Sequence, residues 1–259
     1  MVGRVFLVGA GPGDPELLTL KAVRLIQNCD ALVYDRLVSQ EVLDLAPESV
    51  ELFNVGKRPH MHSVPQQDIN ALLVSLARRG LTVVRLKGGD PFMFGRGGEE
   101  MLALRAVGIP NEIVPGITSA QGAAASIKVP LTHRGLANSV RYLTGHCRDN
   151  AALDFDWEGL ADPSTTLVVY MGLANITEIA NQLMAYGRSP DTPVLAISNA
   201  TRADERRLNT SLRDVSCAVK VAGFQSPVLF VVGDVVAIAR IQEQVFDVVE
   251  DNHLVVAAE

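Results

Sequence analysis

The sequence has few cysteines and few aromatic residues, and it carries no excess of positive charge. Its three cysteines, Cys29, Cys147 and Cys217, are widely separated and form no CxxC pair, so we expect reduced thiols in a cytoplasm. Aromatic residues make up 5% of the chain and the formal net charge is −6. Because nucleic-acid surfaces need basic patches and stacking side chains, this composition disfavours nucleic-acid binding.

Signatures of membrane insertion and metal binding are also missing. No run reaches the roughly 18 uninterrupted apolar residues of a membrane span, and the N-terminal residues have no signal-peptide profile. His133 and His146 have no partners at metal-ligand spacing, so we predict no metal. We expect a cytoplasmic protein without membrane or nucleic-acid partners. With 259 residues, 48% of them hydrophobic, the chain can bury a substantial core.

What the sequence does contain is a pair of glycine–aspartate–proline turns, GAGPGDPELLT at Gly9–Thr19 and GGDPFMFGRG at Gly88–Gly97. Each follows an apolar run with strand character and leads into a segment with helical spacing. Glycine lets a backbone pass close to a ligand, and open α/β sheets bind ligands at the carboxyl ends of their strands. The two turns therefore predict a small-molecule site with a floor of backbone atoms.

The first turn shares some features with a dinucleotide-binding fingerprint. Three glycines follow a strand, and Asp35 ends the next strand, where a ribose-binding acid would stand. However, the spacing is GxGxG rather than GxGxxG, Pro12 removes a backbone donor, and Asp14 adds a negative charge. Because a pyrophosphate needs donors and no adjacent anion, these differences disfavour a dinucleotide oxidoreductase and a phosphate ligand.

The first half of the chain alternates between strand-like and helical periods. Such βα repeats predict a parallel sheet that is covered on both faces. In the first helix we expect Asp14 as the cap and Leu17, Leu20, Val23 and Leu25 on the apolar face. The predicted strands are Arg4–Gly9, Ala31–Tyr34, Val50–Phe53, Thr82–Lys87 and Glu112–Val114, and the predicted helices are Glu16–Asn28, Pro65–Arg79, Gly98–Val107 and Thr118–Ile127.

The second half restarts after a charged, loop-like stretch at Lys128–Ser139. We predict two α/β domains, 1–135 with the glycine turns and 136–259 with a mixed sheet. The run RRLNTSL from Arg206 reads as an edge or antiparallel strand. The other predicted strands are Val140–Thr144, Thr165–Tyr170, Pro193–Ile197 and Val228–Val232, and the helices are Ala174–Tyr186 and Leu212–Val221.

Taken together, the motifs resemble the tetrapyrrole methyltransferases that use S-adenosylmethionine (SAM). The resemblance covers nearly the whole chain: VFLVGAGPGDPELLTLKA, VYDRLVS, GGDPFMFGRGGEE, VPGITSA, PLTHRG, TGH, VYMG and VGDVV occur in that order. It implies the fold of class III methyltransferases, in which two α/β domains hold SAM in the cleft between them. It also implies a homodimer.

The resemblance is to the members that methylate uroporphyrinogen III. It implies that two SAM molecules in succession each donate a methyl group to a pyrrole carbon, giving precorrin-2 and S-adenosylhomocysteine. Precorrin-2 leads to sirohaem, cobalamin or haem d1, and no motif here selects among them. A sister enzyme of the same fold with another substrate, and a regulator that binds the ligands without turnover, remain alternatives.

The resemblance also implies which residues contact SAM. Pro12 and the turn formed by Gly88, Gly89 and Asp90 would lie in the cofactor site, although such residues also make ordinary tight turns. Further contacts would come from hydroxyls that could equally cap a helix, from a methionine that could equally fill a core, and from an alanine after a strand. These are Thr118, Ser119, Met171 and Ala200.

For the substrate we expect arginines, because uroporphyrinogen carries carboxylates around its rim and Arg binds carboxylate with a planar fork. Arg36, Arg96 and Arg134 each lie in a family motif near a predicted strand end, and His146 is a further candidate. Weaker candidates are Lys57, Arg58, Arg141 and Arg148.

Arg96 and Glu99 stand three residues apart at a helix start, so they can share a face. Since Arg hardly ever loses its proton, we hypothesise that Arg96 anchors the substrate and Glu99 accepts or relays the proton. An alternative for Glu99 and Glu100 is that acidic residues simply suit the first turn of a helix.

Overall fold

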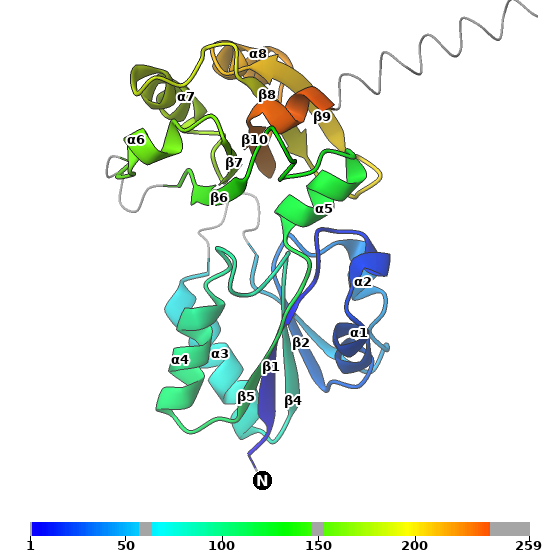
Figure 1. Cartoon of the computed structure of the whole chain (residues 1–259). Coiled ribbons are helices and arrows are strands. Elements are labelled where there is room, and N and C mark those ends of the chain that lie inside the picture. Colours follow the sequence, from blue (N-terminus) through cyan, green and yellow to red (C-terminus); the bar gives the residue numbers. More distant parts are fainter. Residues whose placement is uncertain (1, 57–63, 147–152, 239–259) are drawn as a thin grey trace, which may run out of the picture. The chain divides into compact units, whose positions relative to one another are not determined.

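The computed structural model describes residues 2–56, 64–146 and 153–238 (Figure 1). Contacts within the chain group it into two compact units, Met1–Gly122 and Ala123–Glu259, which we call the N-terminal and C-terminal units. Helix α5 (Ser119–Ser126) crosses the boundary, and its last residue accepts a hydrogen bond from Arg207 at 2.9 Å. Residues 123–135 thus group with the second unit, and the domain assignment 1–135 and 136–259 stays a prediction.

The N-terminal unit contains a five-stranded parallel sheet in the order β3-β2-β4-β1-β5, which confirms the predicted parallel sheet. The inner strands β1 and β4 pair over their full length, so Gly9 and Lys87 end level with each other. The strands are β1 (Arg4–Gly9), β2 (Ala31–Tyr34), β3 (Glu51–Asn54), β4 (Thr82–Lys87) and β5 (Asn111–Val114).

Helices cover both faces of this sheet, as the sequence predicts (Figure 1). Successive residues of a strand point to opposite faces: Val8 packs with Ile26 of α1 on one face, and Leu7 packs with Leu73 of α3 and Leu104 of α4 on the other. The helices are α1 (Leu20–Ile26), α2 (Gln40–Leu43), α3 (Gln66–Arg78) and α4 (Gly97–Ala106).

The prediction of a helix from Glu16 to Asn28 is wrong at its start. Pro15–Leu17 forms a separate 3-10 turn, which Asp14 caps by accepting from the Glu16 N–H. α1 begins only at Leu20, because the Thr19 hydroxyl caps it by accepting from the Ala22 N–H at 3.1 Å. Leu20 is consequently exposed, and Ala22 and Ile26 are the buried residues of α1. The short helix α2 was not predicted.

The C-terminal unit contains a five-stranded mixed sheet in the order β6-β7-β10-β8-β9. β6 and β7 are parallel, whereas the other neighbouring pairs are antiparallel. β9 is therefore an antiparallel edge strand, as predicted. The strands are β6 (Ser139–Thr144), β7 (Thr165–Tyr170), β8 (Pro193–Ser198), β9 (Arg206–Ser211) and β10 (Val228–Val232).

Phe230 of the central strand β10 is fully buried in one core with Leu183 of α7 and Val215 of α8. The helix α6 adds Leu160 to this core and was not predicted, because it is a single turn within a polar segment. The helices are α6 (Trp157–Leu160), α7 (Ile176–Ala185) and α8 (Val215–Val221).

Candidate functional site

The two glycine turns lie side by side at the carboxyl end of the N-terminal sheet. Because β1 and β4 end level, the residues that follow them meet: the N–H of Gly89 donates to the carbonyl of Gly11 at 2.7 Å, and the N–H of Gly11 donates to the carbonyl of Gly89 at 3.2 Å. Both residues have positive φ, 67° and 68°, which glycine adopts without strain. The structure thus brings together the two turns that the sequence singled out.

A third segment, the VPGITSA stretch after β5, joins the two turns through Gly116. A Cβ atom on Gly9 would stand 2.5 Å from the Gly116 nitrogen and 2.7 Å from the Gly89 oxygen. A Cβ atom on Gly116 would stand 2.3 Å from that same oxygen. Real Cβ atoms do not approach backbone so closely, so Gly9 and Gly116 cannot carry a side chain without a backbone shift. Three loops therefore form one compact floor of backbone.

Asp90 holds this floor in shape. Its Oδ1 accepts from the Phe92 N–H at 2.8 Å, and its Oδ2 accepts from the Gly116 N–H at 3.1 Å. One oxygen closes its own turn, and the other ties the turn to the loop after β5. These contacts support the turn-forming interpretation of Asp90.

Thr118 and Ser119 adjoin the same floor, and Arg36 lies in a loop whose next residue adjoins it. Gly89 faces the Ser119 hydroxyl, because a Cβ atom on Gly89 would stand 3.7 Å from it. Thr118 is buried and precedes the first residue of α5. Arg36 is exposed in the loop after β2, and its neighbour Leu37 adjoins Gly88, since a Cβ atom on Gly88 would stand 2.8 Å from the Leu37 Cβ.

Arg96 and Glu99 share one face of the helix start, as their spacing predicted, and they form a forked ion pair. Arg96 Nε donates to Glu99 Oε1 at 2.7 Å, and the other arm of the fork donates to Oε2 at 2.8 Å. Both side chains are about half exposed. The hydrogen bond to Glu99 raises the pKa of Arg96. Arg96 also adopts a left-handed backbone conformation, φ 59°, at the residue before α4.

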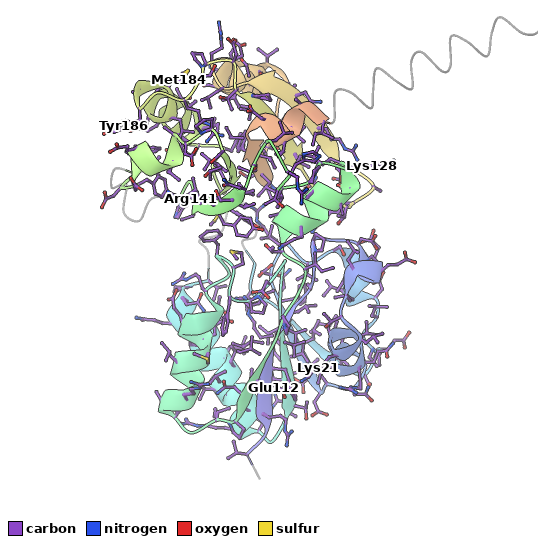
Figure 2. The ribbon with its side chains drawn as sticks, viewed as in Figure 1. Lys21, Glu112, Lys128, Arg141, Met184 and Tyr186 are labelled. Atoms are coloured by element: carbon purple, nitrogen blue, oxygen red, sulfur yellow. The ribbon has the colours of Figure 1, made fainter. Side chains whose placement is uncertain are left out.

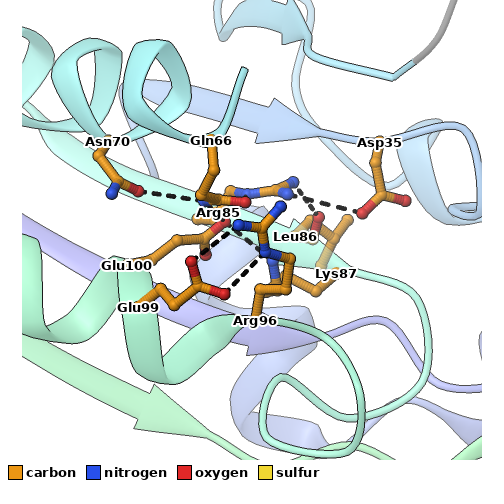
Figure 3. Close-up of polar contacts among 9 residues, drawn as sticks. All are labelled: Asp35, Gln66, Asn70, Arg85, Leu86, Lys87, Arg96, Glu99 and Glu100. Carbon is orange, nitrogen blue, oxygen red and sulfur yellow. Dashed lines mark hydrogen bonds and ion pairs between the residues drawn. The ribbon is translucent and has the colours of Figure 1, made fainter. Parts of the chain in front are cut away.

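Beside this pair lies a buried charge cluster that the sequence reasoning missed (Figure 3). Glu100 is 0% exposed, and its Oε1 accepts from Lys87 Nζ at 2.9 Å and from Arg85 Nε at 3.2 Å. Gln66 donates to the same oxygen at 3.2 Å. Arg85 also reaches Asp35 at 3.6 Å. The helix-dipole interpretation of Glu100 is therefore incomplete, because this residue is an internal anion rather than a surface one.

The signal for this cluster stands in the sequence. Arg85 and Lys87 interrupt the apolar run LTVVRLKG of a central strand, and they are two residues apart, so they point to the same face. Burial and the Arg85 guanidinium lower the pKa of Lys87, while Glu100 opposes this shift. Two cations on one face of a buried strand need an anion, and the acidic first turn of the following helix offers one.

In the C-terminal unit, three of the four predicted residues follow strands that end on the same side of the mixed sheet. β7 and β8 both run antiparallel to β10, and β6 runs parallel to β7. The carboxyl ends of β6, β7 and β8 therefore lie at the same end of the sheet. His146, Met171 and Ala200 follow these three ends. Met171 is 50% exposed and has a φ of 53°. The structure thus brings the segments that contain His146, Met171 and Ala200 to one end of the sheet.

The turn that contains Ala200 is held in an unusual conformation. Thr201 has a φ of 66°, a strained value for a β-branched residue. Its N–H donates to Glu205 Oε2 at 2.7 Å, and Arg207 Nε donates to Glu205 Oε1 at 2.6 Å. Burial alone would raise the pKa of Glu205. The hydrogen bonds from the Thr201 N–H, Ser126 and Arg207 nevertheless hold this pKa below its ordinary value. Glu205 therefore fixes this turn.

Arg134 stands apart from the other candidates of its unit. It is exposed in a turn before the first residue of β6, whereas His146 follows the last residue of that strand, so the two lie at opposite ends of β6.

Lys57, Arg58, Cys147 and Arg148 lie outside the described residues. In the described part of the chain, no three metal-ligating side chains cluster, and no helix has the length and apolar character of a membrane span.

The chain is similar to known proteins both in sequence and in structure. The family of tetrapyrrole (corrin/porphyrin) methylases matches residues 4–216. A uroporphyrinogen-III C-methyltransferase of Paracoccus denitrificans is 57% identical over 239 residues, which are 92% of this chain and 83% of that protein. A siroheme synthase of Methylococcus capsulatus is 49% identical over 92% of this chain, and the chain spans only 50% of its length.

The structural comparison agrees with the sequence comparisons. The crystal structure of a uroporphyrin-III C-methyltransferase from Thermus thermophilus, complexed with S-adenosylhomocysteine, is 43% identical. It has a TM-score of 0.77, with 91% of this chain and 94% of that chain covered. The expected two-sheet α/β fold is thereby confirmed. The chain therefore belongs to the tetrapyrrole methylases.

Proposed function

We propose that this protein is a SAM-dependent C-methyltransferase that methylates uroporphyrinogen III twice to give precorrin-2. The observation that carries the proposal is the floor on which Gly9, Gly89 and Gly116 meet, at the carboxyl end of a parallel sheet. Relatives of the same family, with 57% and 43% identity, are named for methylation of this tetrapyrrole.

The residues fit SAM better than they fit a phosphate ligand. Both oxygens of Asp90 are used by backbone N–H groups, so the turn carries a carboxylate where a phosphate would be repelled. We assign SAM contacts to backbone and small side chains around the floor in the N-terminal unit. In the C-terminal unit we assign them to Ala200 and to Met171, whose thioether suits a sulfonium. These residues are Pro12, Gly88, Gly89, Asp90, Thr118, Ser119, Met171 and Ala200.

We assign the carboxylates of the substrate to Arg36, Arg96, Arg134 and His146. Arg96 is the strongest of these, because its fork already binds a carboxylate, that of Glu99. A substrate carboxylate would replace Glu99 in the fork and release it. Glu99, once released, would be the group that accepts or relays the proton.

The chemistry requires alignment more than covalent help. SAM supplies an electrophilic methyl group on a sulfonium. A pyrrole carbon of the substrate forms the new C–C bond while the C–S bond of SAM breaks. The electron pair of the broken C–S bond stays on the sulfur of S-adenosylhomocysteine. The ring system then loses one proton. The protein's part is to hold the carbon and the methyl group about 3 Å apart, to exclude water and to receive the proton.

The wider setting follows from the proposed reaction. We propose that the protein works as a homodimer in the cytoplasm and stands at the branch to sirohaem, cobalamin or haem d1. Sedimentation of the purified protein would test the dimer.

The deciding experiment is an anaerobic incubation with uroporphyrinogen III and methyl-labelled SAM, followed by mass spectrometry of the tetrapyrrole. A product that is heavier by two labelled methyl groups would establish the activity. SAM binding without label transfer would point to a sister substrate within the family. Absence of SAM binding would overturn the interpretation of the glycine floor.

A further inference from the structure

The buried cluster of Glu100, Arg85 and Lys87 adjoins the proposed catalytic pair, Arg96 and Glu99, at the start of α4. Glu100 comes one residue after Glu99, and in the first turn of α4 the Glu100 N–H donates to the Arg96 carbonyl at 3.3 Å. On the other side of the cluster, Lys87 is the last residue of β4 and precedes Gly88. One ion pair, Lys87–Glu100, therefore connects the strand that carries the second glycine turn with the helix that carries Arg96 and Glu99 (Figure 3).

The start of α4 is held by a backbone contact and by the side chain of Glu100. The capping position is occupied by Arg96, whose side chain makes no cap hydrogen bond. Gly97 donates its N–H to the Pro91 carbonyl at 2.9 Å, which ties the helix start to the Gly88–Gly97 turn. Glu100 supplies the side-chain anchor, through two donors from β4 and one from Gln66 of α3.

Stability alone gives a weak reason for such a cluster. Buried ion pairs cost desolvation, and apolar residues of similar volume are often as stabilising. The cost is evident here, since Glu100 Oε2 is buried and has no hydrogen-bond partner among the described residues. What a charge cluster does provide is one defined geometry, because an arrangement that separated the charges would leave them unpaired in the core.

We propose that Glu100 is a positioning residue for methyl transfer, whose carboxylate, held by Arg85 and Lys87, fixes Arg96 and Glu99 beside the Gly88–Asp90 turn. This inference rests on the proposed function. The Arg85–Asp35 contact extends the same network to the loop that contains Arg36. Three segments that we assign to ligand binding are thus held through one set of internal charges.

The first test is Glu100→Gln, which keeps the shape of the side chain and removes its charge. We expect kcat for the tetrapyrrole to fall at least about tenfold while the KM for SAM changes less than about threefold, because the helix start moves and the glycine floor stays. The matched control is Glu112→Gln. Glu112 pairs with Lys21 on the surface of the same unit (Figure 2), and we expect this control to keep wild-type kinetics.

A second comparison guards against simple unfolding. Lys87→Met with Glu100→Gln removes both charges together, so the double variant should be more stable than the sum of the two single effects predicts. Its kcat should nevertheless stay low, because the helix start has lost its anchor. Wild-type kcat in Glu100→Gln, or strictly additive effects in the cycle, would overturn the inference.

Hydrogen exchange separates this inference from the proposed function. The amides of the first turn of α4 should exchange faster in Glu100→Gln than in wild type and in Glu112→Gln, whether or not the protein methylates uroporphyrinogen. A wild-type protein without activity would refute the function, and the exchange comparison would still decide whether Glu100 holds the turn. Unchanged exchange in this turn would refute the anchoring role.

Discussion

Gly11 and Gly89 exchange two backbone hydrogen bonds, although they are far apart in the sequence. This short antiparallel bridge joins loops that follow two parallel strands. Because each loop is held by the other, the backbone atoms that form the floor of the site are preorganised before a ligand arrives.

The first prediction is that a side chain at Gly9 disrupts the floor of the site. In Gly9→Ala the new Cβ would meet the Gly116 nitrogen at 2.5 Å and the Gly89 oxygen at 2.7 Å, so the loops must separate. We expect a loss of about 1 to 3 kcal/mol in stability and loss of SAM binding, measured by thermal unfolding and calorimetric titration.

Gly98→Ala is the matched control for this substitution. No atom lies within 4 Å of a Cβ atom at Gly98, which is in the first turn of α4. Alanine is favoured over glycine in a helix by about 0.5 to 1 kcal/mol, so stability should rise slightly and SAM binding should persist. If Gly9→Ala behaved like Gly98→Ala, this result would contradict the close approach of Gly9 to Gly89 and Gly116.

The second prediction concerns the forked pair of Arg96 and Glu99. In Arg96→Lys a point charge replaces the fork, so we expect kcat/KM for the tetrapyrrole to fall about 10- to 100-fold, with SAM affinity and stability nearly unchanged. The control is Arg79→Lys, because Arg79 forks onto Glu51 with similar exposure but is not assigned to ligand binding. Full activity of Arg96→Lys would rule out a forked clamp.

Glu99 is tested separately from Arg96. We expect Glu99→Ala to lower kcat at saturating substrate, because the proton loses its acceptor, by about 100-fold or more. Substrate binding should not weaken, since removing Glu99 frees the Arg96 fork for the substrate carboxylate. A normal rate in Glu99→Ala would exclude the proton role and leave Arg96 as a binding residue alone.

The sequence predicts the strands of both sheets within about two residues, because their apolar runs end at glycine or polar residues. It predicts the start of α1 poorly, since Asp14 and Thr19 are both good caps and only the structure shows that each caps a different turn. Local signals of equal strength compete, and tertiary packing decides between them.

The glycine floor could be predicted only in part. Gly9 and Gly89 were recognisable from their motifs, but the approach of Gly116 depends on three loops meeting in space. For Glu100 the sequence allowed an ordinary first-turn role. Its burial follows from Arg85 and Lys87 on the facing strand, which is a relation between elements and not a property of the helix alone.

The third prediction separates the cysteines. Cys29 is buried, and burial raises the pKa of its thiol to about 11, whereas Cys217 is exposed. In a Cys147→Ser background, a disulfide reagent at pH 8 should label Cys217 fast and Cys29 only at the rate of unfolding. Fast labelling that survives Cys217→Ser would contradict the burial of Cys29.

The same thiol predicts a change of stability with pH. The folded state keeps the Cys29 proton up to about pH 11, whereas the unfolded chain releases it near 9.0. Stability therefore falls between these values, by about 2 kcal/mol relative to Cys29→Ala. Chemical denaturation of both proteins at pH 8 and pH 11 measures the difference, and a constant difference would exclude the raised pKa.

The last prediction concerns the turn at Ala200. Glu205 accepts from the N–H of Thr201, whose left-handed backbone is strained, so Glu205→Ala should release the turn. We expect the KM for SAM to rise about tenfold with little change in kcat, since one hydrogen bond to a charged group is worth about 1.5 to 3 kcal/mol. Glu205→Gln retains an acceptor and should fall between wild type and Glu205→Ala.

The pH dependence and a surface control complete this test. Because the pKa of Glu205 is held below its ordinary 4.5, its contribution is present above that value and is lost as the pH falls through the lowered pKa. SAM affinity should therefore hold down to pH 5 in wild type. Asp191→Ala removes an exposed carboxylate that pairs with Arg213 in the same unit and should leave SAM affinity unchanged. Equal effects of the two substitutions would mean that Glu205 acts only through net charge, and not by holding the Thr201 backbone.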